Sequence, residues 1–292
     1  MGTYDTSIRV LACPGCGAPV DVALDGGKVQ CGYCGVAAVY STRPGAPAVV
    51  QSMVPESERL ERLRAQVGRE EPIPDDMKPF LSGPMDAQRR EQAEVMLRSA
   101  RAQAGSDTRD GTVHWLTVAL YNAYAGPENA RRQRALLETA TETLATSSRR
   151  QVLLGMLARN AARTGELAAA EHWLSQMDPQ STLLPAFSAH RLTRAYVDTV
   201  RADYPGVLDA LGEELIDVPL SGGDTLMASV LRANAHERLG DAPTGAAQIA
   251  AYMKKAPPFR PLIERIIAAN PTLALCPEAI VLARTVLDRQ RE

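Results

Sequence analysis

The stretches ARTGELAAAEHWL at residues 162–174 and ERLGDAPTGAAQIAAY at residues 237–252 decide the fold of this chain. In each of them a helical pattern stops at a turn glycine, Gly165 or Gly240, and a second helical pattern opens directly after it. Pro243 stands near the start of one second helix, where its missing N–H costs little. The two stretches therefore each predict a pair of helices joined by a short turn.

This helix–turn–helix unit repeats along the chain. The pairs Asn122-Ala123, Asn160-Ala161 and Asn234-Ala235 lie 38 and then 74 residues apart, and each is followed by a turn glycine. Because 74 is twice 37, we expect a middle copy near residue 197. A single helical pair cannot bury its apolar face, whereas stacked neighbours bury it together. The spacing predicts an array of helical pairs from about residue 107 almost to the end of the chain.

The repeated turn resembles that of the tetratricopeptide repeat. In both stretches an acidic residue follows the glycine, and a small residue, Ala170 or Gly245, stands five positions after the glycine. The resemblance covers about 150 residues, but the period exceeds the usual 34 and the aromatic residues typical of the first helix are mostly absent. The resemblance implies a mainly α fold, a tetratricopeptide-like α-solenoid whose concave face binds a protein partner.

Four cysteines near the N-terminus form the one chemically specific motif. Two CxxC pairs, separated by fourteen residues, each place two thiolates in one tight turn, which is typical of a tetrahedral zinc site. A glycine after each second cysteine, Gly17 or Gly35, permits the positive φ of such a turn. An iron site of the same ligands is the minor alternative, and a disulfide is disfavoured in a reducing compartment. The predicted metal ligands are Cys13, Cys16, Cys31 and Cys34.

The segment CPGCGAPV…CGYCG resembles the zinc-ribbon family over residues 8–41. The resemblance implies a small β unit that holds one structural Zn²⁺ through the four cysteines. Short strands are expected around each CxxC pair, with Asp25-Gly26-Gly27 as a hairpin turn. About 35 residues bury too little apolar surface to fold alone, so the metal is expected to supply the missing stability.

Composition shifts divide the chain into three predicted regions. Residues 1–41 form the zinc ribbon, residues 42–84 a proline-rich linker with a short helix from Glu56 to Val67, and residues 85–292 the helical-repeat domain. Within the linker region, Ile73, Phe80 and Leu81 suggest packing onto another element.

Charge and hydropathy argue against two classes of partner. The net charge is −2, and residues 1–45 balance three basic against three acidic side chains, so the basic surface that phosphate contacts require is missing. No stretch approaches 18 uninterrupted apolar residues, and no apolar N-terminal segment indicates secretion. We therefore expect a cytoplasmic protein without a membrane span and without nucleic acid as its main partner.

Catalytic motifs are missing from the sequence. Four thiolates fill the zinc tetrahedron and leave no position for substrate, and neither HExxH, GxSxG nor a phosphate-binding glycine loop occurs. The fifth cysteine, Cys276, is expected to be a buried core thiol. Asn122, Asn160 and Asn234 are expected to fix packing near the turns, or alternatively to form a ladder of amides that grips a peptide backbone.

These observations predict a non-catalytic, zinc-binding adaptor or scaffold that mediates protein–protein interactions through its helical-repeat surface. Two alternatives stay open. The first is a nucleic-acid-associated regulatory factor that uses the zinc ribbon. The second is an enzyme with a pocket in the helical domain, around His172, His190 and His236. The oligomeric state stays open as well.

Overall fold

A computed structural model describes most of the chain and divides it into two compact units. The units are Met1–Ala65 with Gln180–Thr182, and Gln66–Pro179 with Leu183–Glu292. None of the described helices is long and apolar enough to cross a membrane. The described residues are 8–12, 19–23, 27–31, 35–40, 51–52, 56–69, 72–124, 126–145, 147–213, 217–255, 259–270 and 273–289.

The first unit holds short antiparallel strands and one helix. β1 pairs with β2, and β4 pairs with both β3 and β5. Each CxxC pair thus lies in the connection of one hairpin, between β1 and β2 or between β3 and β4. β2 and β3 contact each other but have no ladder of hydrogen bonds among the described residues. Residues 25 and 26 of the expected hairpin turn lie outside the described residues. The elements are β1 (Ile8–Ala12), β2 (Pro19–Ala23), β3 (Gly27–Gln30), β4 (Ala37–Tyr40), β5 (Gln51–Ser52) and α1 (Glu56–Arg64).

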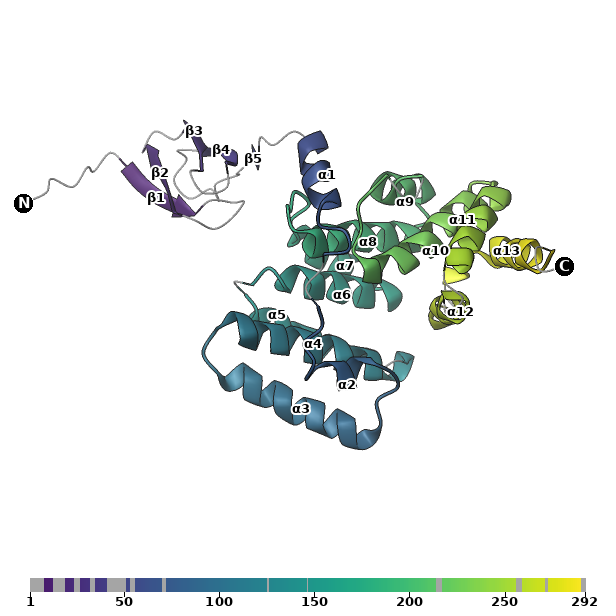
Figure 1. The fold of residues 1–292 in the computed structure, drawn as a ribbon, viewed down its shortest axis with the longest axis horizontal. Coiled ribbons are helices and arrows are strands. Elements are labelled where there is room, and N and C mark those ends of the chain that lie inside the picture. The colour runs from purple at the N-terminus through teal and green to yellow at the C-terminus, as the bar shows by residue number, and fades with distance from the viewer. Residues whose placement is uncertain are drawn as a thin grey trace, which may run out of the picture. The chain divides into compact units, whose positions relative to one another are not determined.

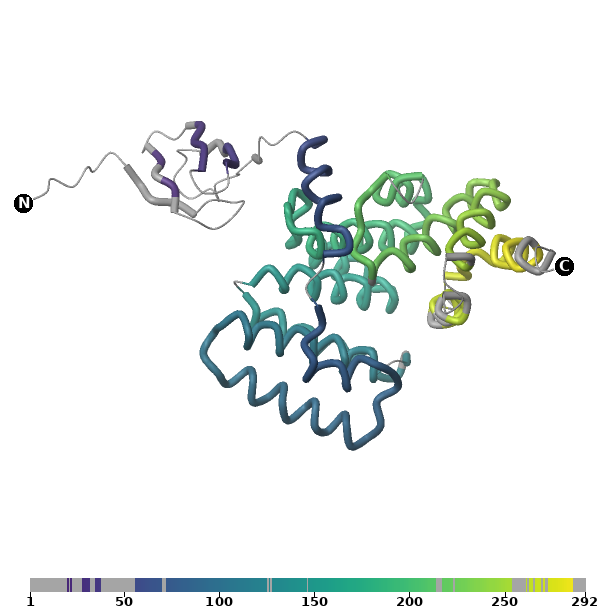
Figure 2. Tube along the Cα trace, in the orientation of Figure 1, coloured from purple at the N-terminus to yellow at the C-terminus, as the bar shows by residue number. Residues whose placement is uncertain are grey.

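The second unit is built of helices that pack in the order of the chain, which confirms the mainly α prediction (Figure 1). The chain can be followed through them from blue at α3 to yellow at α13 (Figure 2). The helices are α2 (Lys78–Leu81), α3 (Ala87–Ala102), α4 (Asp107–Ala123), α5 (Ala130–Thr143), α6 (Arg150–Arg163), α7 (Leu167–Ser175), α8 (Leu184–Val200), α9 (Tyr204–Leu211), α10 (Gly222–Arg238), α11 (Ala242–Lys255), α12 (Phe259–Ala269) and α13 (Pro277–Arg289), with a 3₁₀ turn at Pro127–Asn129.

Neighbouring helices form consecutive pairs. α4 packs on α5, α6 on α7, α8 on α9 and α10 on α11. We call α4, α6, α8, α10 and α12 the first helices, and of these α6 contacts α8, α8 contacts α10 and α10 contacts α12. In Figure 1 the ribbons of α6, α8 and α10 lie next to one another. Three of these contacts therefore join helices that alternate in the chain.

Three turns between paired helices have the same hydrogen bonds. At Gly165, Ala202 and Gly240 the backbone φ is positive, at 82°, 59° and 92°. The residue after each one donates its N–H to the carbonyl five residues back, at 2.8–2.9 Å, which is the Schellman arrangement of a helix C-terminus. The expected copy near residue 197 is thus present, with alanine where the other turns have glycine.

Small residues line the helix contacts of the core. Ala161, Ala170, Ala195 and Ala233 are fully buried in the cluster that extends from α6 to α13. A second cluster joins α2 to α6. Phe80 is buried in it and Leu81 packs against it, as the sequence suggests, whereas Ile73 is exposed. Alanines bring helix backbones close together and hold the first helices at fixed spacing.

Candidate functional site

Of the four predicted zinc ligands the structure describes Cys31, whose backbone bonds to residues on the far side of its CxxC pair. The Cys31 N–H donates to the Val36 carbonyl at 2.8 Å, and the Gly35 N–H donates to the Cys31 carbonyl at 2.9 Å. Gly35 has the positive φ, 72°, that the sequence predicted for the residue after the CxxC pair. Cys31 is buried, with 3% of its surface exposed. A buried cysteine in such a turn fits a thiolate ligand of a tetrahedral metal.

The other three predicted ligands, Cys13, Cys16 and Cys34, lie outside the described residues. Within the described part of the chain no three potential ligands come together, but only one of the four cysteines belongs to that part. Zinc binding therefore stays a prediction.

A groove of about 1070 Å³ runs along the first helices of the second unit. Most of the side chains that line it come from α4, α6, α8, α10 and α12, and Gln133 comes from α5. Its apolar lining includes Trp115, Val118 and Tyr121 of α4, Val152 and Met156 of α6, Leu192 and Tyr196 of α8, Leu226 and Met227 of α10, and Ile266 of α12. Helices that alternate in the sequence thus contribute most of one surface.

Two arginines of α6 bring positive charge to the groove. Arg159 donates from Nη1 to Thr193 Oγ1 at 3.0 Å, and Arg163 donates from Nη2 to Gln133 Oε1 at 2.5 Å. Both partners are neutral. Tyr196 lies close by and donates its hydroxyl to Asn270 Oδ1 at 2.7 Å. Burial raises the pKa of Tyr196 to about 12, so its hydroxyl remains a neutral hydrogen-bond donor.

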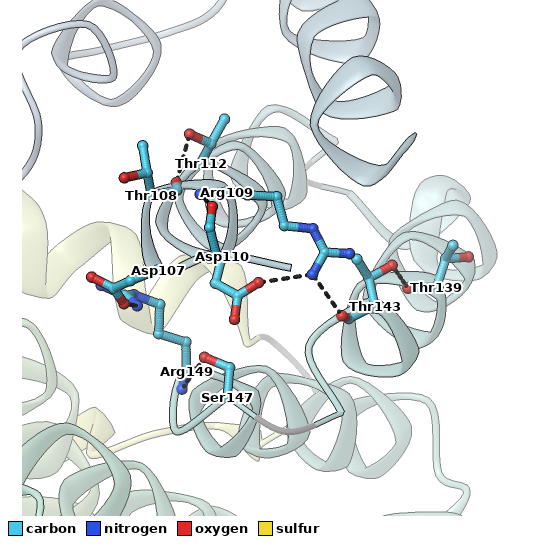
Figure 3. A network of polar contacts seen from close by, with 10 residues as sticks. Asp107, Thr108, Arg109, Asp110, Thr112, Thr139, Thr143, Ser147 and Arg149 are labelled. Carbon is cyan, nitrogen blue, oxygen red and sulfur yellow. Dashed lines mark hydrogen bonds and ion pairs between the residues drawn. The ribbon is translucent and has the colours of Figure 1, made fainter. Parts of the chain in front are cut away.

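One end of the groove is braced by a polar network that links α4, α5 and α6 (Figure 3). Arg149 donates to Asp107 Oδ1 at 2.5 Å, across the starts of α4 and α6. Arg109 donates to Asp110 at 2.8 Å and to the Thr143 carbonyl at 3.2 Å, where α5 ends. The Asp107 carboxylate is thereby engaged at the mouth of the groove.

His114 is buried beside this network and also lines the groove. Burial, assisted by the positive charge of Arg149, lowers the pKa of His114 to about 4. The imidazole is therefore neutral at pH 7.

The groove's second carboxylate belongs to Asp224, in the first turn of α10. Its Oδ2 accepts hydrogen bonds from Ser188 Oγ at 2.7 Å and Ser221 Oγ at 2.9 Å. The Ser221 N–H in turn donates to Ser188 Oγ at 3.0 Å. Both serine hydroxyls thus bond to a carboxylate, and the cluster joins α8 to the start of α10.

The three asparagines of the repeat do not form one ladder. Asn160 is buried and donates to Gln133 Oε1 at 3.3 Å, and Asn234 is buried and accepts from the Cys276 N–H at 2.9 Å. Asn122 lines the groove. Asn160 and Asn234 thus hold packed elements together, as one of the two interpretations expected, whereas among the described residues Asn122 does not.

The three histidines named as a possible catalytic pocket are dispersed. His190 lines a second, smaller cavity of about 570 Å³, together with Asp198 and Arg194. His172 is within 3.0 Å of the Gln176 side chain, and His236 is within 3.3 Å of Gln248. Among the described residues these histidines do not share a site.

Sequence reasoning missed Arg159 and Arg163 as groove residues. It also missed Asn270, which follows Asn234 by 36 residues and therefore continues the spacing of the repeat to the residue after α12. The repeat spacing could have found Asn270. No sequence signal separates Arg159 and Arg163 from solvated arginines.

Comparison with known proteins finds no matching family model, no similar curated protein and no similar solved structure.

Proposed function

We propose that this chain is a non-catalytic adaptor whose helical repeats, arranged as a tetratricopeptide-like α-solenoid, bind a segment of a protein partner. The observation that carries the proposal is the groove along the first helices. Its volume of about 1070 Å³ lies just above the usual range of small-molecule pockets, and six helices contribute to its lining. An extended chain of several residues fills such a surface better than a compact metabolite does.

The groove's chemistry also favours binding over catalysis. Its histidine is neutral at pH 7, and its two carboxylates are engaged, Asp107 with Arg149 and Asp224 with two serines. Its lining combines aromatic and aliphatic side chains with polar ones. Such a surface offers apolar contacts for side chains and hydrogen bonds that set their register.

For the N-terminal unit we propose a structural zinc site made by Cys13, Cys16, Cys31 and Cys34. Cys31 fits this role through its burial and its turn, with Gly35 at positive φ. When bound, the metal would supply folding stability that two short hairpins lack. A reducing, cytoplasmic environment would keep the thiols available to it.

Selection from a displayed library of random 12-residue peptides tests the adaptor proposal. We expect peptides that bind the wild-type chain and lose at least tenfold in affinity on a Val118→Gln/Val152→Gln variant, which makes two half-buried groove positions polar. A Val95→Gln/Val281→Gln variant is the matched control, since both of these valines are exposed and outside the lining of the groove. Peptides that bind all three proteins equally would contradict the proposal.

A further inference from the structure

We propose that the groove recognises an acidic segment, an extended peptide whose internal Asp or Glu side chain pairs with Arg159 and Arg163. This inference rests on the proposed function and adds the chemical class of the ligand. It starts from the positive charge that Arg159 and Arg163 bring to a groove whose lining is otherwise largely apolar.

The two guanidinium groups have unused donors that face one surface. Arg159 and Arg163 are four residues apart in α6, so their side chains lie on the same side of the helix. Each is half-buried, and each bonds to a neutral oxygen, Thr193 Oγ1 or Gln133 Oε1. No ion pair of Arg159 or Arg163 occurs within the described residues. A guanidinium carries five N–H donors, so most of the donors on each arginine remain available.

The two carboxylates that line the groove bond to groups other than Arg159 and Arg163. Asp107 pairs with Arg149, and Asp224 bonds to Ser188 and Ser221. The positive charges of Arg159 and Arg163 therefore have no matching negative charge among the described residues of the lining. A half-buried arginine pair is matched best by a carboxylate, which accepts two parallel N–H bonds from one guanidinium.

The arginine pair belongs to α6, whereas the apolar lining comes from helices on either side of α6 in the chain. Trp115 and Val118 are contributed by α4, and Leu192, Met227 and Ile266 by α8, α10 and α12. The pair contacts helices on both sides, because Arg163 bonds to Gln133 of α5 and Arg159 to Thr193 of α8. A ligand that fills both sides must pass across α6 rather than stop there. The carboxylate at the arginines is therefore a side chain within the peptide, with apolar residues before and after it, rather than the end of the peptide.

The peptides selected on the wild-type chain supply the probe for the test. The most enriched 12-residue peptide is synthesised with a fluorescein label in three forms, with a free C-terminus, with an amidated C-terminus, and with its acidic residues changed to Asn or Gln. Fluorescence anisotropy then measures Kd for each form at two salt concentrations. We expect the free and amidated forms to bind alike, the neutral form to bind at least tenfold more weakly, and salt to weaken the acidic forms.

Matched variants locate the charge. Arg159→Gln/Arg163→Gln should lower affinity for the acidic peptide at least tenfold and leave the neutral form unchanged. Arg98→Gln/Arg131→Gln removes the same charge from exposed positions of α3 and α5, and it should bind like the wild type. Arg159→Lys/Arg163→Lys keeps the charge and the fold, and it should retain part of the affinity even if the glutamine variant folds poorly.

Several outcomes would overturn the inference. Enriched peptides without acidic residues would contradict the charge recognition, and so would equal binding of the acidic peptide by the wild type and by Arg159→Gln/Arg163→Gln. In either case, weaker binding by Val118→Gln/Val152→Gln would still support the groove as the peptide site. Binding that requires a free C-terminus would show that the arginines pair with the terminal carboxylate of the peptide instead of an internal side chain. A single-stranded oligonucleotide that binds with the same dependence on Arg159 and Arg163 would replace the peptide. If no selected peptide binds more weakly to Val118→Gln/Val152→Gln than to the wild type, the proposed function is contradicted as well.

Discussion

Arg232 Nε donates a hydrogen bond to the carbonyl oxygen of Gly212 at 3.0 Å. Its Nη2 donates to the carbonyl of Leu211 at 3.2 Å, so one guanidinium of α10 covers the C-terminal end of α9. Only 1% of the Arg232 surface is exposed, and burial lowers the pKa of its guanidinium. A cation at a helix C-terminus satisfies carbonyls that the helix itself leaves unpaired. This contact joins one helical pair to the next.

Replacing Arg232 by methionine should destabilise the protein strongly. The change keeps much of the side-chain bulk but leaves two buried carbonyl oxygens without their donor. We expect a loss of about 2–4 kcal/mol in the free energy of unfolding, measured by urea titration. Arg98→Met, at an exposed position, should cost less than about 0.5 kcal/mol. A loss of the same size in both variants would show that Arg232 acts through general charge rather than through the two carbonyls.

A methyl group at Gly245 should also destabilise the protein. An ideal Cβ at this position would lie 2.6 Å from the Ala233 carbonyl oxygen, because α11 packs closely on α10 there. Gly245→Ala forces the two backbones apart, and we expect it to cost about 1–3 kcal/mol. Gly222→Ala is the control, since nothing lies within 4 Å of its ideal Cβ. Equal urea midpoints for the two variants would contradict the close approach.

The Schellman turn at Ala202 should become more stable with glycine. Ala202 has φ of 59°, a conformation that costs an L-residue about 1–2 kcal/mol and glycine almost nothing. Glycine loses about 0.5–1 kcal/mol more conformational entropy on folding than alanine does, and this loss offsets part of the gain. Ala202→Gly should therefore raise the free energy of unfolding by up to about 1 kcal/mol. Gly165→Ala, in the equivalent turn, should lower it. Thermal denaturation of both variants checks the opposite signs, and a shift in the same direction would refute the shared geometry.

His114 should make the protein less stable in mild acid. Its pKa is lowered from 6.5 to about 4 in the folded chain, so the unfolded chain binds the proton more tightly. The stabilisation from neutral His114 is complete above pH 6.5 and is lost as pH falls toward 4. The full effect is on the order of 3 kcal/mol.

Urea titration between pH 7 and pH 4.5 measures this dependence. His114→Gln should have a flatter profile than the wild type over that interval. Carboxyl groups with lowered pKa values, such as Glu94 and Glu166, titrate mainly below it. Parallel profiles for variant and wild type would assign the acid sensitivity to other groups.

The zinc prediction concerns metal content. Purified chain should contain one zinc per molecule by elemental analysis, and Cys31→Ser should lose most of it, because three thiolates hold zinc more weakly than four. Cys276→Ser is the matched control. Cys276 is also buried, and burial raises the pKa of its thiol to about 12, so it is a poor metal ligand. Full zinc content in Cys31→Ser would exclude the four-cysteine site.

Local patterns predicted the elements of this fold well. The glycine turns at Gly165 and Gly240, the positive φ at Gly35 and the succession of helices after residue 107 were readable because each depends on near neighbours in the chain. Turn residues and helical periodicity act over a few positions, so their signal lies in the sequence itself. The expected strands around the CxxC pairs are present, while residues 25 and 26 of the expected turn between β2 and β3 lie outside the described residues.

The groove depends on contacts between residues far apart in the chain. Arg159 and Ile266 line one surface although more than 100 residues separate them, and the local sequence around either residue does not indicate that they share it. Whether an arginine is solvated or faces a groove is settled by how the first helices pack. Likewise, Asn160 and Asn122 hold the same place in the repeat, yet one is buried and the other lines the groove. Repeat spacing sets which helices are equivalent, and the packing of each pair on its neighbours sets which side chains remain available to a ligand.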